Sequence, residues 1–395
     1  MQAQECVKFL ATLLTYPTIT PQECGIYEPI KSLLTQAGFE CLHIDKDNTR
    51  NLFAHITLGD TSSARVGEHF CFMGHIDVVP AGEGWSVEPF GAVVENGYIY
   101  GRGAQDMKAG VAAFTYALLD FAKAAQSLTA PLMLSLLLTS DEEGEGTYGT
   151  AYALKELAKR DLLPTHAIVA EPTCSTALGD TIKNGRRGSI NGVLEIVGKQ
   201  GHAAYPSKCI NPIEALGAHL GKLAGVELDS GDRDFAPTKL VITDIRGGLE
   251  VVNVTPSALK IMFNVRNSPS TSKESVQKYV ESIMQAVCAE NAGISYTLSL
   301  KQSAKPFVCK RDSRLIHKLS ASIQKVCGIT PECSTSGGTS DARFCQEFGI
   351  EAIEFGVCND RIHSIDERVK ITEVEQLYRV FRAFLERFAS HCHNT

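Results

Sequence analysis

The stretch LMLSLLLTSDEEG, residues 132–144, joins an apolar strand to a cluster of acids, and it decides the fold class. So short an apolar run, broken only by Ser135, predicts a strand that is covered on both faces of a sheet. Consecutive residues of an extended chain point in opposite directions, so Glu142 and Glu143 suit two different tasks at one site, metal ligand and general base. Taken alone, however, the cluster is more typical of a solvated acidic turn.

Strands and helices alternate on both sides of this strand. Further strands are expected at 69–74 and 166–170, and helices at 109–125 and 151–159. This alternation predicts the α/β class, with a central mixed, mostly parallel sheet and helices on both of its faces. In such sheets functional sites gather beyond the carboxyl ends of the strands.

A different pattern occupies the middle of the chain. The expected order there is strand, helix, two strands, helix and strand, which is that of a ferredoxin-like α+β sandwich. These elements are expected at 189–197, 212–224, 239–245, 257–266, 273–289 and 294–300. The first pattern then returns, with a helix at 313–326, a strand at 352–356 and a helix at 371–388. We therefore predict a split catalytic domain, 1–183 plus 301–395, that carries an inserted domain at 184–300.

The composition is that of an ordinary globular protein: 44% of the 395 residues are hydrophobic, 21% are charged, and the net charge is −7. The absence of a basic block argues against nucleic-acid binding. No apolar run reaches the roughly 18 residues of a membrane span. The amino-terminal segment lacks the features of a secretion signal, so we expect a cytoplasmic protein whose thirteen irregularly spaced cysteines are reduced and mostly buried.

Metal ligands occur at five places where strands end or loops adjoin them. His75 and Asp77 are two residues apart, so they share a face of an extended segment, and Asp77 is placed to orient the imidazole. Asp106 stands in a glycine-rich loop before a helix. The other three places are Glu142–Glu143, Glu171 and His363.

Each place has an ordinary explanation on its own. A histidine after a strand is usually a structural hydrogen-bonding group, Asp106 could be a helix N-cap, and Glu171 could be solvated. The combination is more informative than its parts. Two histidines and three carboxylates, each at a strand exit or in an adjacent loop, match the ligand set of two zinc ions that share one bridging carboxylate.

The same motifs carry a family resemblance. The segments that carry it are GHIDVVPAG at 74–82, GRGAQDMKAG at 101–110, TSDEEG at 139–144, AEPT at 170–173, GHAAYP at 201–206 and SGGTSDARF at 336–344. They resemble the dinuclear-zinc amidohydrolases, which include aminoacylases, acetylornithine deacetylase and glutamate carboxypeptidases. The combination of AEPT, RRGSI at 186–190, GGTSDARF at 337–344 and HSIDERV at 363–369 most resembles the bacterial succinyl-diaminopimelate desuccinylases within that superfamily. A zinc-peptidase-like catalytic domain is therefore implied.

The resemblance also implies a role for each ligand. Asp106 would bridge two Zn²⁺ ions per subunit, with His75 and Glu171 completing one site and Glu143 and His363 completing the other. Co²⁺ or Mn²⁺ could substitute for zinc.

Three further residues receive catalytic roles from the resemblance. Asp77 would support His75, and Glu142 would be the general base and later the acid. His202 would reach into the neighbouring subunit's site and help to hold the oxyanion. The protein would then be a homodimer formed through the inserted domain.

Arginines in and near the inserted domain favour an anionic substrate, because a guanidinium binds a carboxylate through two parallel hydrogen bonds. A lone arginine would more simply be a surface residue. The resemblance implies hydrolysis of N-succinyl-LL-2,6-diaminopimelate to succinate and LL-2,6-diaminopimelate, in lysine and peptidoglycan precursor biosynthesis. The expected substrate-binding residues are Arg186, Arg187, Asn253, Arg266, Gly338, Thr339, Ser340 and Arg343.

One position departs from the family pattern. Where two asparagines are common, this chain has Val252-Asn253, and a valine cannot supply the hydrogen bond of an amide. Fine specificity is therefore open, and another N-acyl-amino-acid deacylase, similar to acetylornithine deacetylase, or a dipeptidase of the superfamily is the alternative. A zinc-binding protein without turnover is a further alternative. Glu142 argues against it, because a non-catalytic scaffold has no need of a base beside its ligands.

Overall fold

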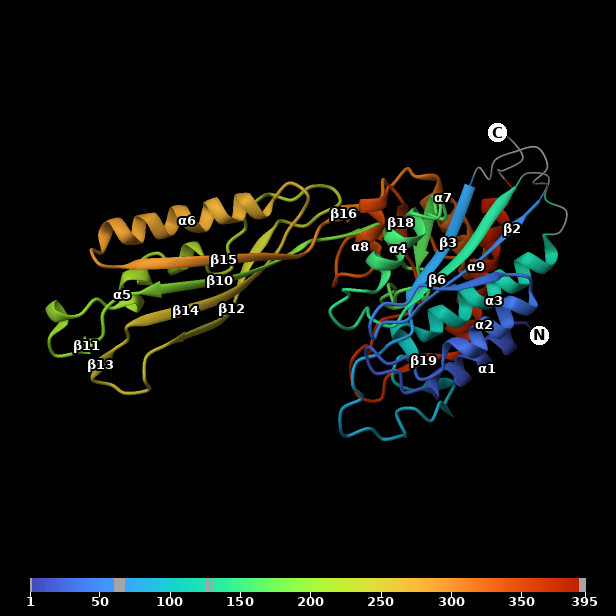
Figure 1. Cartoon of the computed structure of the whole chain (residues 1–395), viewed down its shortest axis with the longest axis horizontal. Helices are drawn as coiled ribbons and strands as arrows, with labels where there is room; N and C mark the ends of the chain where they lie inside the picture. Colours follow the sequence, from blue (N-terminus) through green and yellow to red (C-terminus); the bar gives the residue numbers. More distant parts are fainter. Residues whose placement is uncertain (1, 60–67, 126–127, 129–130, 391–395) are drawn as a thin grey trace. The chain divides into compact units, whose positions relative to one another are not determined.

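The computed structural model describes residues 2–59, 68–125, 128 and 131–390. The chain forms two compact units (Figure 1). The larger unit comprises Met1–Gly185, Cys309–Ser334 and Ser340–Thr395, and the smaller unit comprises Arg186–Val308 and Thr335–Thr339. The boundaries thus differ from the predicted 184–300. The last strand of the smaller unit runs on to Ala304, and the short segment 335–339 packs with this unit although it lies far along the chain.

The larger unit is built on an eight-stranded sheet of order β1-β2-β6-β3-β7-β18-β8-β17. The central strands β6, β3, β7 and β18 are parallel to one another, whereas β1 and β2 are antiparallel at one edge. The predicted mixed, mostly parallel sheet is thereby confirmed. The strands are β1 (Glu40–His43), β2 (Asn51–Leu58), β3 (Glu68–His75), β6 (Leu132–Thr139), β7 (His166–Val169), β8 (Thr181–Lys183), β17 (Glu332–Ser334) and β18 (Glu351–Glu354).

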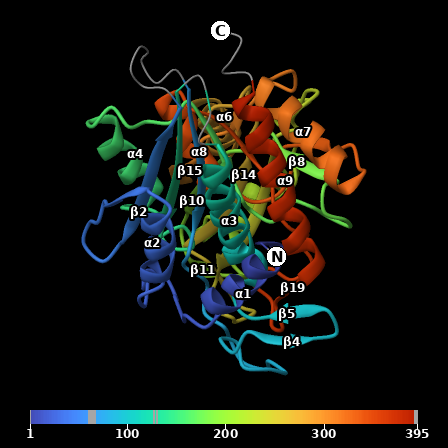
Figure 2. The same cartoon turned by 90° about the vertical axis from the view of Figure 1, so that its right-hand side faces the viewer.

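Helices cover this sheet and bury its apolar side chains. Helices α1, α3 and α9 pack on one another and lie side by side in Figure 2. The aromatic core joins them to β3, since Phe72 stacks on Phe114 of α3 with ring centroids 5.4 Å apart and contacts Phe381 of α9 at 4.8 Å. The helices of this unit are α1 (Gln2–Leu14), α2 (Tyr27–Gln36), α3 (Ala109–Ala124), α4 (Thr150–Ala158), α7 (Arg314–Cys327), α8 (Ala342–Cys345) and α9 (Ile371–Ala389).

The smaller unit has the strand and helix order of the predicted ferredoxin-like sandwich. Its antiparallel sheet has the order β12-β14-β10-β15, and α6 lies along the sheet (Figure 1). Residues of β10, β14 and α6 form its apolar core, among them Leu194, Ile261 and Val280. The elements are β10 (Ser189–Val197), α5 (Pro212–Gly217), β12 (Lys239–Gly247), β14 (Ala258–Arg266), α6 (Lys273–Glu290) and β15 (Ser295–Ala304).

One helix of the smaller unit is shorter than predicted. The expected helix at 212–224 ends at Gly217, and only a single 3₁₀ turn, Leu220–Lys222, follows it. Two glycines, Gly217 and Gly221, interrupt the segment, and glycine is among the poorest helix formers.

Short pairings complete the chain. They are β11 (Gly201–His202) with β13 (Val254–Thr255), β9 (Gly185–Arg186) with β16 (Phe307–Val308), and β19 (Arg368–Lys370) with β5 (Tyr98–Tyr100) and β4 (Val93–Glu95). Within the described ranges, no helix combines the length and the apolar character needed to cross a membrane. The described cysteines all carry free thiols, and Cys24 alone among them is exposed.

Candidate metal centre

The larger unit brings the five predicted metal ligands together in two clusters. Ligand atoms of His75, Asp106 and Glu171 lie within 4.8 Å of one another, and so do those of Asp106, Glu143 and His363. In the part of the chain that the structure describes, these are the groups of histidine, cysteine and acid side chains that could hold a metal ion. Because Asp106 belongs to both clusters, the centre could hold two ions that share one carboxylate.

The sheet topology explains why these residues meet. His75 is the last residue of β3, the acidic turn follows β6, and Glu171 follows β7. Strand β3 pairs in parallel with both β6 and β7, so the three strands end along the same edge of the sheet. This is the carboxyl edge at which the sequence predicts the site.

The first cluster is buried. The Nε2 atom of His75 lies 3.1 Å from Asp106 Oδ1 and 3.8 Å from Glu171 Oε1. The Nδ1 atom of the same ring lies 2.9 Å from the main-chain oxygen of Asp77 and 3.6 Å from its carboxylate. The ring is therefore oriented mainly by the carbonyl of Asp77 and not, as its spacing from His75 predicts, by its side chain. An Nδ1–H that donates to this carbonyl leaves Nε2 available for a metal.

The second cluster is more open. His363 Nε2 lies 2.9 Å from Glu143 Oε1 and 3.4 Å from Asp106 Oδ2, and the His363 side chain is 47% exposed. His363 has a φ of 58°, a left-handed conformation that is uncommon for any residue with a side chain. The two carboxylate oxygens of Asp106 thus face different histidines, as a bridging ligand must.

Asp106 lies in an irregular turn, Ala104–Lys108, ahead of α3. Its φ of −117° and ψ of 95° are not helical, and the residue before α3 is Lys108, so Asp106 is not the cap of this helix. Gly103 begins the turn with a φ of 85°, and a Cβ there would lie 2.5 Å from a methyl group of Val78. Only glycine fits at this position without displacing a neighbour.

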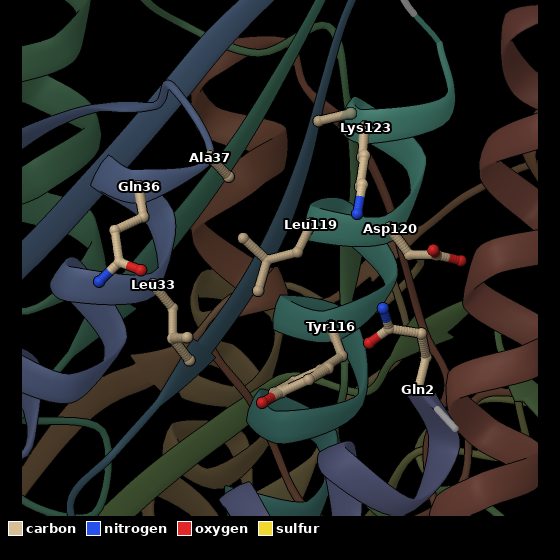
Figure 3. Close-up of a pocket in the computed structure, with 9 residues that line it drawn as sticks. Gln2, Leu33, Gln36, Ala37, Tyr116, Leu119, Asp120 and Lys123 are labelled. Atoms are coloured by element: carbon tan, nitrogen blue, oxygen red, sulfur yellow. The ribbon is translucent and has the colours of Figure 1, made fainter.

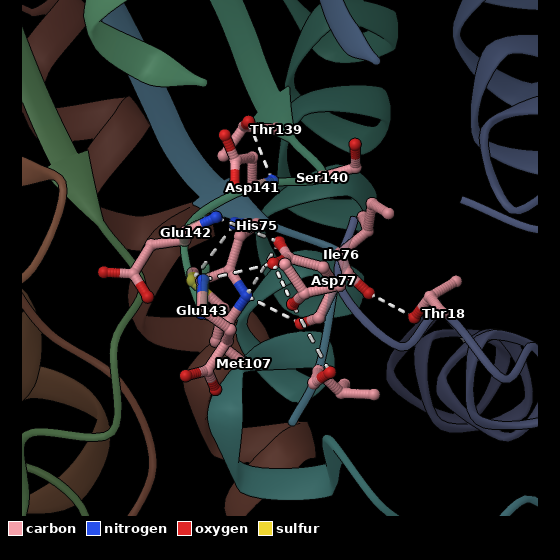
Figure 4. Close-up of polar contacts among 12 residues, drawn as sticks. Thr18, His75, Ile76, Asp77, Met107, Thr139, Ser140, Asp141, Glu142 and Glu143 are labelled. Carbon is pink, nitrogen blue, oxygen red and sulfur yellow. Dashed lines mark hydrogen bonds and ion pairs between the residues drawn. The ribbon is translucent and has the colours of Figure 1, made fainter. Parts of the chain in front are cut away.

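The side chain of Asp77 has a second task that the sequence did not disclose. Its buried carboxylate accepts the main-chain N–H groups of Glu142 at 3.3 Å and Glu143 at 3.1 Å (Figure 4). The hydroxyl of Thr20 donates to the same carboxylate at 2.6 Å. Asp77 therefore fastens the acidic turn after β6 to the end of β3, and this holds Glu143 against His363.

The protonation behaviour of the centre reflects crowded negative charge. Burial and the charge of Asp106 raise the pKa of Glu171 well above its ordinary value, and burial and the charge of Asp341 do the same for Glu142. Hydrogen bonds to Asp106 and Glu143 raise the pKa of His363 to about 10. A metal ion beside Glu171 would supply the positive charge that favours the ionised form of this ligand.

Glu142 lies beside the clusters but belongs to neither. Asp341, the acid whose charge acts most strongly on Glu142, is buried and accepts the Thr150 hydroxyl at 2.6 Å. Burial raises the pKa of Asp341 as well. Asp341 was not among the predicted site residues, although it lies in the SGGTSDARF segment that carries the resemblance. Spacing gave no further signal, because the two residues are almost 200 positions apart.

The predicted substrate-binding residues are divided between the units. Ser340 and Arg343 belong to the larger unit, and the others belong to the smaller unit. Several of these side chains already have protein partners. Arg186 donates to the main-chain oxygen of Ser336 at 2.9 Å, Ser340 donates to the carboxylate of Glu354, and Arg343 lies over the ring of Phe344 at 4.4 Å.

Arg187 and Arg266 differ from the rest of this set. Neither forms an ion pair with any described residue, and the Nε of Arg187 is buried without a hydrogen-bond partner in that part of the chain. Burial and the neighbouring charge of Arg187 lower the pKa of Arg266. Two guanidinium groups near each other without an acid form a local excess of positive charge in the smaller unit.

His202 lies on the small ribbon formed by β11 and β13, where it pairs with Val254. The imidazole is exposed, and its Nδ1 accepts the N–H of Ala204 at 3.0 Å. The main-chain oxygen of Asn253 accepts the N–H of Ala203 at 2.9 Å, so His202 and Asn253 lie in neighbouring positions. Val252, the position that departs from the family pattern, is fully exposed at the turn before them.

A separate hollow lies between α2 and α3, with a volume of about 650 Å³ (Figure 3). It is lined by Gln2, Leu33, Gln36, Ala37, Tyr116, Leu119, Asp120, Ala122 and Lys123. None of the predicted site residues lines it.

Known proteins resemble this chain in sequence and in fold. The model of peptidase family M20/M25/M40 matches residues 71–387. A relative from Helicobacter hepaticus, named succinyl-diaminopimelate desuccinylase, is 53% identical over 388 residues, which are 97% of each chain. The aminopeptidase PepT of Bacillus cereus has a similar structure, with a TM-score of 0.77 and 20% identity over 98% of this chain and 99% of that one. The Bacillus subtilis YXEP protein, a dinuclear metal binding peptidase, matches 98% of both chains with a TM-score of 0.71 and 15% identity.

Proposed function

The chain belongs to peptidase family M20/M25/M40, and we propose that it is a metal-dependent amidohydrolase that cleaves N-succinyl-LL-2,6-diaminopimelate to succinate and LL-2,6-diaminopimelate. The observation that carries this proposal is the sequence identity to the Helicobacter hepaticus relative that is named for this activity. The two chains are 53% identical over 97% of the length of each. The reaction would serve lysine and peptidoglycan precursor biosynthesis. The ligand clusters provide the site at which the chemistry would occur.

We assign the five ligands to two ions. His75 and Glu171 would hold one ion, Glu143 and His363 would hold the other, and Asp106 would join both. Nitrogen and oxygen donors in this proportion fit zinc, and Co²⁺ or Mn²⁺ accepts the same donors. When bound, the ions would polarise the amide carbonyl and make water acidic enough to attack near neutral pH.

Glu142 is the residue that we assign to proton transfer. Its carboxylate would take a proton from the attacking water as the bond to the carbonyl carbon forms, and would give that proton to the amine as the C–N bond breaks. Two observations support this assignment. Glu142 is not part of either ligand cluster, and the bond from its N–H to Asp77 fixes the backbone from which its side chain departs.

The substrate proposal has support in the smaller unit. N-succinyl-diaminopimelate carries three carboxylates, and the unpaired guanidinium groups of Arg187 and Arg266 suit one of them. We keep Arg186, Asn253, Gly338, Thr339, Ser340 and Arg343 as further proposed contacts. Arg186, Ser340 and Arg343 would have to add a substrate contact to the protein contacts that they already make.

We also propose that the protein is a homodimer and that His202 acts on the neighbouring subunit's substrate. An exposed imidazole at the end of a two-stranded ribbon is free to donate a hydrogen bond to a developing oxyanion.

The experiment that tests the substrate is a comparison of kcat/KM across a panel. Zinc-loaded enzyme would be given N-succinyl-diaminopimelate, N-acetylornithine, N-acetyl and N-formyl amino acids, and dipeptides. We expect the succinyl substrate to have the highest kcat/KM. Faster hydrolysis of acetylornithine would make the chain a deacetylase of the same family, and absence of all turnover would favour a binding protein.

A second measurement addresses recognition of the anion. Arg266→Met should raise KM for the succinyl substrate at least tenfold, since a charge-assisted hydrogen bond to a carboxylate contributes about 1.5–3 kcal/mol. The matched control is Arg246→Met in the same unit, because Arg246 is exposed and already paired with Asp244 at 2.6 Å. An unchanged KM for Arg266→Met would remove this arginine from the substrate site.

A further inference from the structure

One buried carboxylate, that of Glu367, joins the two loops that present Asp106 and His363. Its Oε2 accepts Arg102 Nη1 at 2.7 Å and the N–H of Gly103 at 3.0 Å. Its Oε1 accepts the N–H groups of Gln105 at 2.8 Å and Asp106 at 3.1 Å. Glu367 stands four positions after His363, so the loop of one ligand holds the backbone of the other.

Arg102 strengthens the same junction. Its Nη1 also donates to the main-chain oxygen of Ser364 at 3.1 Å, and its Nη2 donates to that of Ala81 at 3.0 Å. The guanidinium lies over the ring of Trp85 at 5.2 Å. The guanidinium of Arg102 therefore connects the His363 loop to the loop that follows β3.

Gln105 forms a third connection between these loops. Its side-chain oxygen accepts the N–H of Arg361 at 2.9 Å, and its side-chain nitrogen donates to Asp360. The segments 102–106 and 360–367 are thus joined at several points by buried or half-buried polar groups, and Glu367 receives the largest number of these hydrogen bonds.

The remaining ligands have a different kind of support. His75 ends the long strand β3, and Glu171 follows β7, so the sheet itself holds the backbone of both. Asp106 has non-helical backbone angles and His363 has a positive φ, and neither lies in a strand. Their separation consequently depends on hydrogen bonds between loops.

We propose that Glu367 is a positioning residue that sets the distance between Asp106 and His363 and thereby the affinity of the second metal site. The proposal rests on the proposed function only in that the two clusters bind metal ions. The first site, which contains Asp106 but neither Glu143 nor His363, depends on Glu367 less.

The arrangement requires a carboxylate. Each oxygen of Glu367 accepts two donors, and the residue is 1% exposed, so water cannot replace a lost partner. In either orientation of its amide, a glutamine at this position would turn its NH₂ group towards two N–H donors. A donor that is buried without an acceptor is destabilising, so the loop that carries it would shift to restore its hydrogen bond.

The test is a metal titration of metal-free protein. Zn²⁺ would be added in competition with a chromophoric chelator, and the affinities of the first and second ions would be compared between wild type and Glu367→Gln. We expect the second-ion affinity to fall about 10- to 100-fold, the range typical of groups that orient metal ligands, and the first-ion affinity to change much less.

The matched control is Asp229→Asn in the smaller unit. Asp229 is also a carboxylate that gathers a loop, accepting the N–H groups of Gly231 at 2.9 Å and Thr238 at 2.8 Å. This control should lower the unfolding temperature and leave both metal affinities unchanged. A general loss of stability is thus separated from a selective loss at the second site.

A folded Glu367→Gln protein with an unchanged second-ion affinity, or with equal losses at both sites, would overturn the proposal. If Glu367→Gln does not fold, Arg102→Lys provides the test, because it keeps the charge next to Glu367 and removes the planar fork. It should show the same selective loss, and unchanged affinities would again contradict the proposal. The titration needs no substrate, so an error in the substrate assignment does not affect its outcome.

Discussion

The carboxylate of Asp77 accepts the main-chain N–H of Glu143 at 3.1 Å, and this bond fastens the acidic turn to the strand that carries His75. Asp77 therefore has two connections to the centre, through its carbonyl to the His75 ring and through its carboxylate to the turn.

Replacement of Asp77 should therefore disturb both the His75 ring and the acidic turn. Asp77→Asn keeps the volume but turns an NH₂ group towards N–H donors, so we expect kcat/KM to fall about 10- to 100-fold. Thr20→Val, which removes only the hydroxyl that donates to Asp77, should cause a smaller loss, and Thr20→Ser should restore wild-type activity. Steady-state kinetics decide this, and full activity of Asp77→Asn would show that the turn is held by other contacts.

Glu142→Ala should abolish most turnover while metal binding persists. General acid–base catalysis contributes typically 10²- to 10⁴-fold, so kcat should fall by about that factor. Elemental analysis should still find the wild-type metal content, since Glu142 is in neither cluster. Glu145→Gln is a suitable control, because Glu145 is an exposed acid of the same turn. Retained kcat in Glu142→Ala would remove this residue from the mechanism.

A mixing experiment tests whether His202 acts across a dimer. Homodimers of Glu142→Ala and of His202→Ala should each be nearly inactive. In a mixed dimer, the His202→Ala subunit keeps its own Glu142 and receives the intact His202 of its partner, so one site is complete. Activity should therefore appear after the two variants exchange subunits. No recovery, with mixed dimers verified by mass, would place His202 in its own subunit's site or outside the mechanism.

Gly110 should be intolerant of a methyl group. A Cβ at Gly110 would lie 2.4 Å from the main-chain oxygen of Ala170, the residue before Glu171. Gly110→Ala should then cost about 1–3 kcal/mol of unfolding free energy and weaken binding of the first ion. Gly217→Ala is the matched change, because nothing lies within 4 Å of its Cβ and alanine favours a helix. Chemical denaturation should therefore show a lower unfolding free energy than wild type for Gly110→Ala and a higher one for Gly217→Ala. Equal changes in the two variants would contradict the packing argument.

His69 should make stability depend on pH. Burial lowers its pKa from 6.5 to about 4, while its ring nitrogens contact Ser135 Oγ at 2.6 Å and the main-chain oxygen of Leu163 at 3.1 Å. The unfolded state then binds more protons between pH 4 and 6.5, so the unfolding free energy rises with pH across this window. The contribution is complete above pH 6.5 and is lost as the pH falls towards 4, by about 3 kcal/mol at most.

The check on this prediction is the slope of unfolding free energy against pH for metal-free protein. His69→Gln should have a flatter profile between pH 4.5 and 6.5 than wild type. His43→Gln, which replaces an exposed ring, is the control and should keep the wild-type slope. Parallel profiles for wild type and His69→Gln would show that other groups cause the pH dependence.

Much of this protein could be predicted from local patterns. The apolar run 132–138 and the alternation around it predict a parallel-centred sheet, and parallel strands bring their exits to one edge, so His75, Glu143 and Glu171 could be expected close together without coordinates. The order of elements in the inserted unit likewise predicts its sheet. The helix expected at 212–224 was predicted too long. Its segment contains Gly217 and Gly221, and the low helix preference of glycine ends the helix at Gly217.

Only the tertiary structure decided how the ligands are held. Contacts between residues that are distant in sequence leave no periodic trace, so neither the bond between Asp77 and the acidic turn nor the effect of the Asp341 charge on Glu142 could be anticipated. The same is true of the four hydrogen bonds that Glu367 accepts from residues 102–106. The sequence thus determined which side chains meet at the centre. Hydrogen bonds between loops, which depend on distance and direction in the folded chain, decided their geometry.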